Sequence, residues 1–77
     1  MTHLYLLDDN INSFKYVYTA LMEHAKHLPI QAEQCCLLAH EKGKCHIKQG
    51  DFMDMYKLKE SLEKLDIQIQ MQDERNE

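Results

Sequence analysis

Residues 66–72, "DIQIQMQ", alternate polar and apolar side chains without a break. A period of two is typical of a β-strand with one face buried and one face in water. We therefore expect Ile67, Ile69 and Met71 to face a core and the glutamines to face solvent. Such a strand needs neighbouring strands and a cover for its apolar face, so the chain must build a sheet that is covered on one side.

Two other segments predict strands. Residues 4–7, "LYLL", form a short apolar run, and residues 44–49, "KCHIKQ", alternate Cys45 and Ile47 with lysines and His46. Gly50 and Asp51 end the second of these strands.

Three segments carry apolar residues at the i, i+3, i+4, i+7 spacing of amphipathic helices. We expect the first at residues 13–27, with Asn12 as its N-cap. The second begins at Pro29 and stops at Gly43, the residue best suited to a left-handed C′ position. Its inner face holds Ala32, Cys35, Cys36 and Ala39. The inner face of the first helix is expected to hold Phe14, Val17, Tyr18, Leu21, Met22, Ala25 and Leu28.

The third helix is expected to follow Asp51 as its N-cap. Its apolar stripe consists of Phe52, Met55, Leu58, Leu62 and Leu65. Three methionines, Met53, Met55 and Met71, are interpreted as core residues that fill irregular gaps.

These elements predict an α+β fold in β-α-α-β-α-β order. We expect a two-layer sandwich in which a three-stranded antiparallel sheet carries all three helices on one face. A chain of 77 residues has room for one small domain. We assign residues 1–72 to this domain and residues 73–77 to a loose acidic tail.

Charge and composition narrow the class of protein. The formal net charge is −4, and the nine Lys and Arg residues are scattered along the chain, which argues against nucleic acid as a partner. No apolar run reaches the roughly 18 residues that a membrane span requires. The three cysteines include no CxxC spacing, and the start "MTHLYLLDD" is unlike a signal peptide. We expect a soluble, intracellular protein in a reducing compartment.

Oxygen-bearing side chains gather directly after the first strand, in "DDNINSF". The spacing of Asp8, Asn10 and Asn12 copies the opening of a calcium loop. The copy fails because Ser13 stands where that loop needs glycine and Thr19 stands where it needs a bidentate glutamate. We therefore expect no calcium site here.

Cys36 and His40 lie four residues apart, and so on one face of the expected second helix. This spacing suits two zinc ligands, but at most one of Cys45 and His46 can join them, and a structural zinc site needs four. The pair also suits a nucleophile and its base, although no Gly-rich backbone accompanies it to form an oxyanion hole. We therefore interpret the cysteines as buried structural residues, with no metal, cofactor or catalytic role. His40 is interpreted either as a solvated residue at the helix end or as a residue at the edge of a pocket.

In these segments the chain resembles the ClpS family, the bacterial adaptors that recognise N-degrons. Family members have a strand that ends in Asn-Asp-Asp, a capped helix of the type Thr-Pro-Met-Glu-Phe-Val, and a second helix that ends in Val-His-x-x-Gly. The corresponding residues here are 8–10, 12–17 and 39–43, and no gap is needed from residue 4 to about residue 48. The resemblance covers nearly the whole chain.

The resemblance implies a binding function. ClpS domains hold the free α-ammonium of a protein whose first residue is Leu, Phe, Tyr or Trp, and pass it to the unfoldase ClpA or ClpC of the ClpP protease. By correspondence, Asp9 would face the ammonium, His40 would accept one of its protons, and Asp8 would take a position usually held by Asn. The first side chain would enter an apolar pocket walled by Asn12, Phe14, Val17, Cys36, Ala39 and Ile67.

The family's unfoldase-binding surface corresponds to Asp54 with Lys57 or Lys59 on the third helix. Family members also carry a flexible extension before the first strand. Only Met1, Thr2 and His3 precede the expected first strand here, which predicts either a trimmed chain or a different mode of delivery.

Three residues of the expected pocket differ from those common in the family. Phe14 replaces the common Met, and Cys36 and Ala39 are smaller than their usual counterparts, so we expect a reshaped pocket.

We expect a monomer that acts in the bacterial cytoplasm. The alternative is a protein-interaction module of the same fold without N-degron activity.

Overall fold

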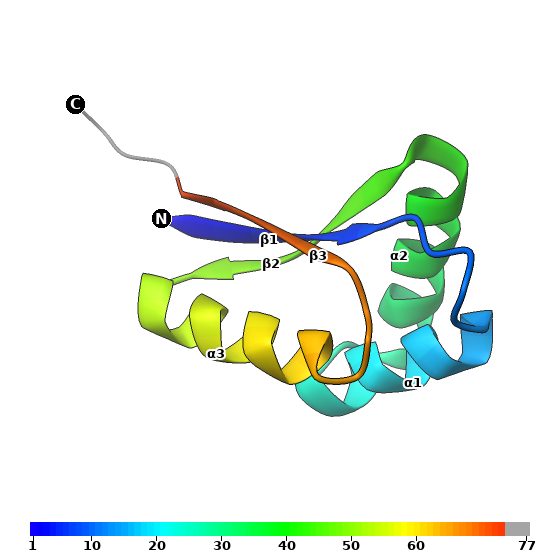
Figure 1. The fold of residues 1–77 in the computed structure, drawn as a ribbon, viewed down its shortest axis with the longest axis horizontal. Coiled ribbons are helices and arrows are strands. Elements are labelled where there is room, and N and C mark those ends of the chain that lie inside the picture. Colours follow the sequence, from blue (N-terminus) through cyan, green and yellow to red (C-terminus); the bar gives the residue numbers. More distant parts are fainter. Residues whose placement is uncertain (74–77) are drawn as a thin grey trace.

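The computed structural model of the chain describes residues 1–73. Six elements follow one another as strand, helix, helix, strand, helix and strand (Figure 1), which confirms the predicted α+β order. Their bounds are β1 Thr2–Leu7, α1 Phe14–His24, α2 Pro29–Lys42, β2 Lys44–Gly50, α3 Phe52–Glu63 and β3 Ile69–Asp73.

β1 is the central strand of the sheet. It pairs antiparallel with both other strands, so the strand order is β2-β1-β3. Along β1, Thr2, Leu4 and Leu6 are buried, and the residues between them face the other side and are half-buried. The sheet therefore has the single buried face that the alternating segments predicted.

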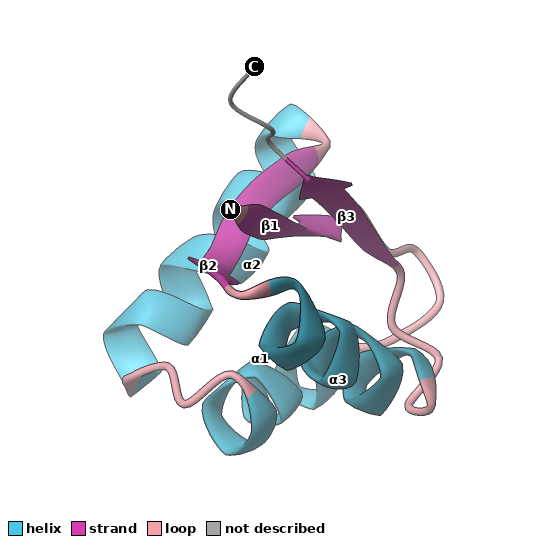
Figure 2. Cartoon of the chain, turned by 90° about the vertical axis from the view of Figure 1, so that its left-hand side faces the viewer, coloured by secondary structure: helices cyan, strands magenta, loops and turns pink. Residues whose placement is uncertain are grey.

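The helices cover that buried face from one side of the sheet (Figures 1 and 2). α2 and α3 pack against the strands, whereas α1 packs against α2 and α3. Small residues on the α1 and α2 faces, among them Ala20, Ala32 and Ala39, are almost fully buried. The other core side chains are Leu4, Leu6, Val17, Leu21, Ala25, Cys35, Cys36, Ile47, Met55, Leu62, Ile67 and Ile69.

A β-bulge adjusts β2 to its neighbour. The register of the β1–β2 pair shifts between Leu4, which lies opposite Lys48, and Tyr5, which lies opposite His46. Ile47 is the extra residue at this shift, and its side chain is buried.

The boundaries of α1 differ from the prediction at both ends. Ser13, not Asn12, is the N-cap, because its hydroxyl accepts from the Tyr16 N–H at 3.1 Å. The helix ends at His24, because Lys26 adopts a left-handed conformation (φ 60°) that an α-helix cannot continue. Leu28, expected in the apolar stripe, lies beyond this turn and is 63% exposed.

The helix α2 matches its prediction at both ends. It begins at Pro29 and is followed by Gly43, whose φ of 92° is the left-handed conformation that glycine adopts without strain. The Gly43 N–H donates to the Ala39 carbonyl at 2.9 Å.

The first turn of α3 is more exposed than predicted. Met53 lies two residues before buried Met55, and therefore on the opposite side of the helix, where it faces solvent. Phe52 is also exposed, and its ring stacks on Tyr56 instead of entering the core. Asp51 occupies the N-cap position but makes no capping hydrogen bond with its side chain.

A left-handed turn ends α3 and starts the approach to β3. Asp66 has φ 63°, and the Ile67 N–H donates to the Leu62 carbonyl at 3.3 Å, as in a Schellman motif. Both Ile67 and Leu62 are buried, which supplies the hydrophobic contact that accompanies this motif.

The last described residue belongs to the fold. Asp73, predicted to start the tail, ends β3, and its carboxylate accepts from the Thr2 hydroxyl at 3.0 Å. The rest of the predicted tail, residues 74–77, lies outside the described residues. Within residues 1–73, no helix has the length and apolar character to cross a membrane.

Leu62 has no exposed surface, so its truncation should remove apolar contacts and leave a cavity beneath the sheet. We expect Leu62→Ala to lower the free energy of unfolding by about 2–5 kcal/mol. Urea denaturation, monitored by circular dichroism, measures this change. Met53→Ala, on the exposed side of the same helix, is the matched control and should change it by less than about 0.5 kcal/mol. Equal losses in the two variants would contradict this description of the core.

Candidate functional site

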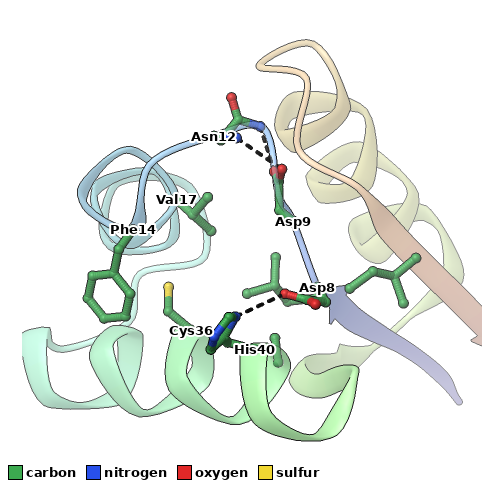
Figure 3. A pocket seen from close by; sticks show the side chains of 10 residues that line it. Asp8, Asp9, Asn12, Phe14, Val17, Cys36 and His40 are labelled. Atoms are coloured by element: carbon green, nitrogen blue, oxygen red, sulfur yellow. Dashed lines mark hydrogen bonds and ion pairs between the residues drawn. The ribbon is translucent and has the colours of Figure 1, made fainter.

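A cavity of about 260 Å³ opens where β1 ends, between the following loop and helices α1 and α2 (Figure 3). Polar groups from the loop and the end of α2 lie on one side, and apolar groups from the two helices lie on the other. The lining residues are Leu6, Leu7, Asp8, Asp9, Asn12, Phe14, Val17, Cys36, Ala39 and His40.

Asp9 organises the loop between β1 and α1. One of its carboxylate oxygens accepts from the Ile11 N–H (2.8 Å) and the Asn12 N–H (3.0 Å), and the other accepts from the Asn12 side-chain amide (2.6 Å). The same amide donates to the Asp66 carbonyl at 2.8 Å. Asp9 and Asn12 thus tie the cavity loop to the turn that precedes β3.

These hydrogen bonds favour the ionised form of Asp9. Partial burial acts to raise the pKa of its carboxyl, but hydrogen bonds from the Asn12 backbone, the Asn12 side chain and the Ile11 backbone outweigh burial and hold the pKa below its usual value. Asp9 is therefore a carboxylate at neutral pH.

Asp8 and His40 meet at the mouth of the cavity. The Asp8 N–H donates to the Gly43 carbonyl at 3.0 Å, which places the aspartate beside the end of α2. Its carboxylate lies 3.4 Å from His40 Nδ1, as the dashed line in Figure 3 shows. The His40 side chain is 75% exposed and that of Asp8 is 37% exposed, so both are accessible to a ligand.

The opposite side of the cavity is apolar. Val17, Cys36 and Ala39 are buried, whereas Phe14 is 47% exposed at the rim. Burial, and to a smaller degree the charge of Cys45, raises the pKa of Cys36 to about 11, so its thiol is neutral at physiological pH. A neutral buried thiol behaves as a small apolar group.

The structure brings together most of the residues that the sequence singled out. Asp8, Asp9, His40, Asn12, Phe14, Val17, Cys36 and Ala39 all line this one cavity. Ile67 does not line it, because the turn at Asp66 directs Ile67 into the core against Leu62. Ile67 instead borders a separate hollow beside Ile11 and Asp66.

Two lining residues, Leu6 and Leu7, were not predicted as part of the site. Their position directly before Asp8 in the sequence could have indicated that they lie at the cavity. Leu6 is buried in the sheet, and Leu7 is half-buried on the other face. They lie at the point where β1 meets the loop, so the end of the strand contributes to the cavity wall.

The α3 residues considered for an unfoldase surface lie elsewhere. Asp54 and Lys57 border a hollow that shares no residue with the cavity described above. Lys59 donates to Glu63 at 2.8 Å, one turn further along the helix.

Cys36 and His40 line the same cavity, but a metal site would need further ligands beside them. Within residues 1–73, no three His, Cys, Asp or Glu side chains are grouped so that they could hold a metal ion. The arrangement instead offers carboxylates and an imidazole at the mouth and an apolar wall beyond them, which suits a ligand with a cationic end and a hydrophobic end.

The chain was compared with models of protein families. The model of the ATP-dependent Clp protease adaptor protein ClpS matches residues 1–72. A comparison with curated proteins gives no match.

The hydrogen bonds to Asp9 predict an acid-sensitive contribution to stability. Because its pKa is lowered by folding, this contribution is complete above about pH 4, the ordinary range of aspartate, and is lost as the pH falls through the lower folded value. We expect Asp9→Asn to be less stable than the wild type at pH 6, with the difference shrinking by pH 2.5 in urea titrations. Asp51→Asn is the matched control at pH 6 and should change the stability less than Asp9→Asn does, because the Asp51 side chain makes no capping hydrogen bond. A difference for Asp9→Asn that is constant with pH would refute this role.

Proposed function

The chain belongs to the ClpS family of Clp protease adaptors, and we propose that it binds proteins through a free N-terminal α-ammonium and a bulky hydrophobic first residue. In this proposal it delivers them to a Clp unfoldase, ClpA or ClpC, for degradation by ClpP. The observation that carries the proposal is the single cavity with carboxylates at its mouth and an apolar wall behind them.

The mouth of the cavity matches an ammonium group. A carboxylate has about four lone-pair positions, and Asp9 uses three of them within the loop, so one remains for a ligand N–H. Asp8 offers a second carboxylate, and His40 offers a ring nitrogen. Hydrogen bonds between an ammonium and a carboxylate are of the strong, charge-assisted kind.

The apolar wall matches the side chain of a first residue. A ligand whose ammonium lay at Asp8 and His40 would have its side chain within reach of Val17, Cys36 and Ala39, which line the cavity from the two helices. Transfer of a large apolar side chain from water into such a site contributes roughly 1.5–3 kcal/mol. Small or polar first residues would lack this contribution.

Delivery requires a second surface, and we propose that Asp54, Lys57 and Lys59 on α3 contribute to it. The support is their separation from the cavity, which leaves a bound substrate and a bound unfoldase free to occupy different parts of the molecule. The adaptor would act as a non-catalytic monomer in the bacterial cytoplasm.

The free α-ammonium is the central requirement of the proposal. We expect a peptide that begins with Phe to bind with a dissociation constant at least about tenfold lower than the same peptide with an acetylated N-terminus, because acetylation removes the charge and its hydrogen bonds. Fluorescence anisotropy of the paired peptides measures this. Equal binding, or binding of neither, would reject N-degron recognition and favour a protein-interaction module of the same fold.

His40 should contribute an acceptor for the ligand's ammonium, because its ring lies at the mouth of the cavity, 3.4 Å from the Asp8 carboxylate. We expect His40→Ala to raise the dissociation constant of the Phe peptide about tenfold, the effect of losing one hydrogen bond to a charged group. Fluorescence anisotropy at one fixed pH measures this. His24→Ala, on the exposed end of α1, is the matched control and should leave the constant unchanged. An unchanged affinity in His40→Ala would remove His40 from the site.

A further inference from the structure

We propose that this site prefers an aromatic first residue over leucine, and that Phe14 sets the preference. The proposal rests on the function proposed above and specifies which ligand fits best. Three features of the cavity carry it: its size, the ring of Phe14, and the small side chains opposite that ring.

The size of the cavity suits a ring. An apolar cavity of about 150 Å³ in a protein core is large enough to bind benzene. The cavity here measures about 260 Å³. A phenyl or larger aromatic side chain therefore fits, whereas a leucine side chain leaves part of the wall without contacts and forfeits the dispersion energy of those contacts.

Phe14 presents an aromatic surface to this space. It is the first residue of α1, and its ring stacks on that of Tyr18 one turn later, with centroids 6.3 Å apart and planes inclined by 19°. The stacking restrains the ring while leaving it 47% exposed at the rim. An incoming ring can therefore pack on Phe14 with little loss of side-chain freedom, and aromatic pairs contribute beyond their buried area.

The residues across the cavity make room for that ring. Cys36 and Ala39 line it from α2, and both are small and buried. The Cys36 thiol is neutral, so this wall presents no charge to a π-system. The ammonium-binding pair of Asp8 and His40 lies at the mouth, so the part of the cavity lined by Phe14, Val17 and Cys36 is left for the side chain.

The test compares two peptides that differ only in a first residue of Phe or Leu. For the wild type we expect the Phe peptide to bind about three- to tenfold more tightly, in line with the extra energy of an aromatic pair. In Phe14→Leu the ratio should fall at least about twofold, through weaker binding of the Phe peptide with little change for the Leu peptide, while the size of the cavity still favours the Phe peptide. Isothermal titration calorimetry gives all four constants.

The chain supplies a matched control. Phe52 is also an exposed phenylalanine at the first position of a helix, with its ring stacked on a tyrosine one turn later, but it lies on α3 and does not line the cavity. Phe52→Leu should keep the wild-type ratio. A wild-type preference for Leu, equal binding of the two peptides, or an equal loss for both peptides in Phe14→Leu would overturn the role of Phe14. Failure of both peptides to bind the wild type would instead reject the proposed function itself.

Discussion

The hydrogen bonding of β1 on both edges is the constraint on which the rest of the molecule depends. β1 is the only described strand with two neighbours, and its Leu4 and Leu6 side chains are almost completely buried against the helices. At the end of the strand the Leu7 N–H donates to the Gln68 carbonyl, and one residue beyond it the Asp8 N–H donates to the Gly43 carbonyl. The strand therefore brings the end of α2 and the turn before β3 to the place where Asp8 and Asp9 emerge.

This position gives the cavity two chemically different sides. Charged and polar groups lie where backbone hydrogen bonds from a loop and a helix end can orient them, as the three donors around Asp9 show. The apolar side is built by helix faces that also belong to the core, so Val17, Cys36 and Ala39 serve packing and the cavity wall together. Phe14 differs from them, since it is held by Tyr18 at the rim instead of by the core.

The sequence predicted the elements well where periodicity and end signals agreed. Pro29 and Gly43 mark the ends of α2 because each favours a backbone conformation that depends little on tertiary contacts. Predictions failed where two neighbouring residues competed for one role or where an apolar residue lay near a helix end. Ser13 caps α1 because the Asn12 side chain is engaged by Asp9 and Asp66, which are brought together only by the fold. Leu28 and Phe52 satisfy the helical period, but they lie at helix ends and stay exposed.

The sequence by itself determined the order of the elements, the single buried face of the sheet, and the membership of residues 1–72 in the ClpS family, because periodicity and local motifs are properties of the chain. It also marked eight of the residues that line the cavity. Only the tertiary structure decided that Ile67 packs in the core while Leu6 and Leu7 reach the cavity, and that Asp8 contacts His40. These outcomes depend on the left-handed turn at Asp66 and on hydrogen bonds between segments far apart in the chain, which no local pattern records.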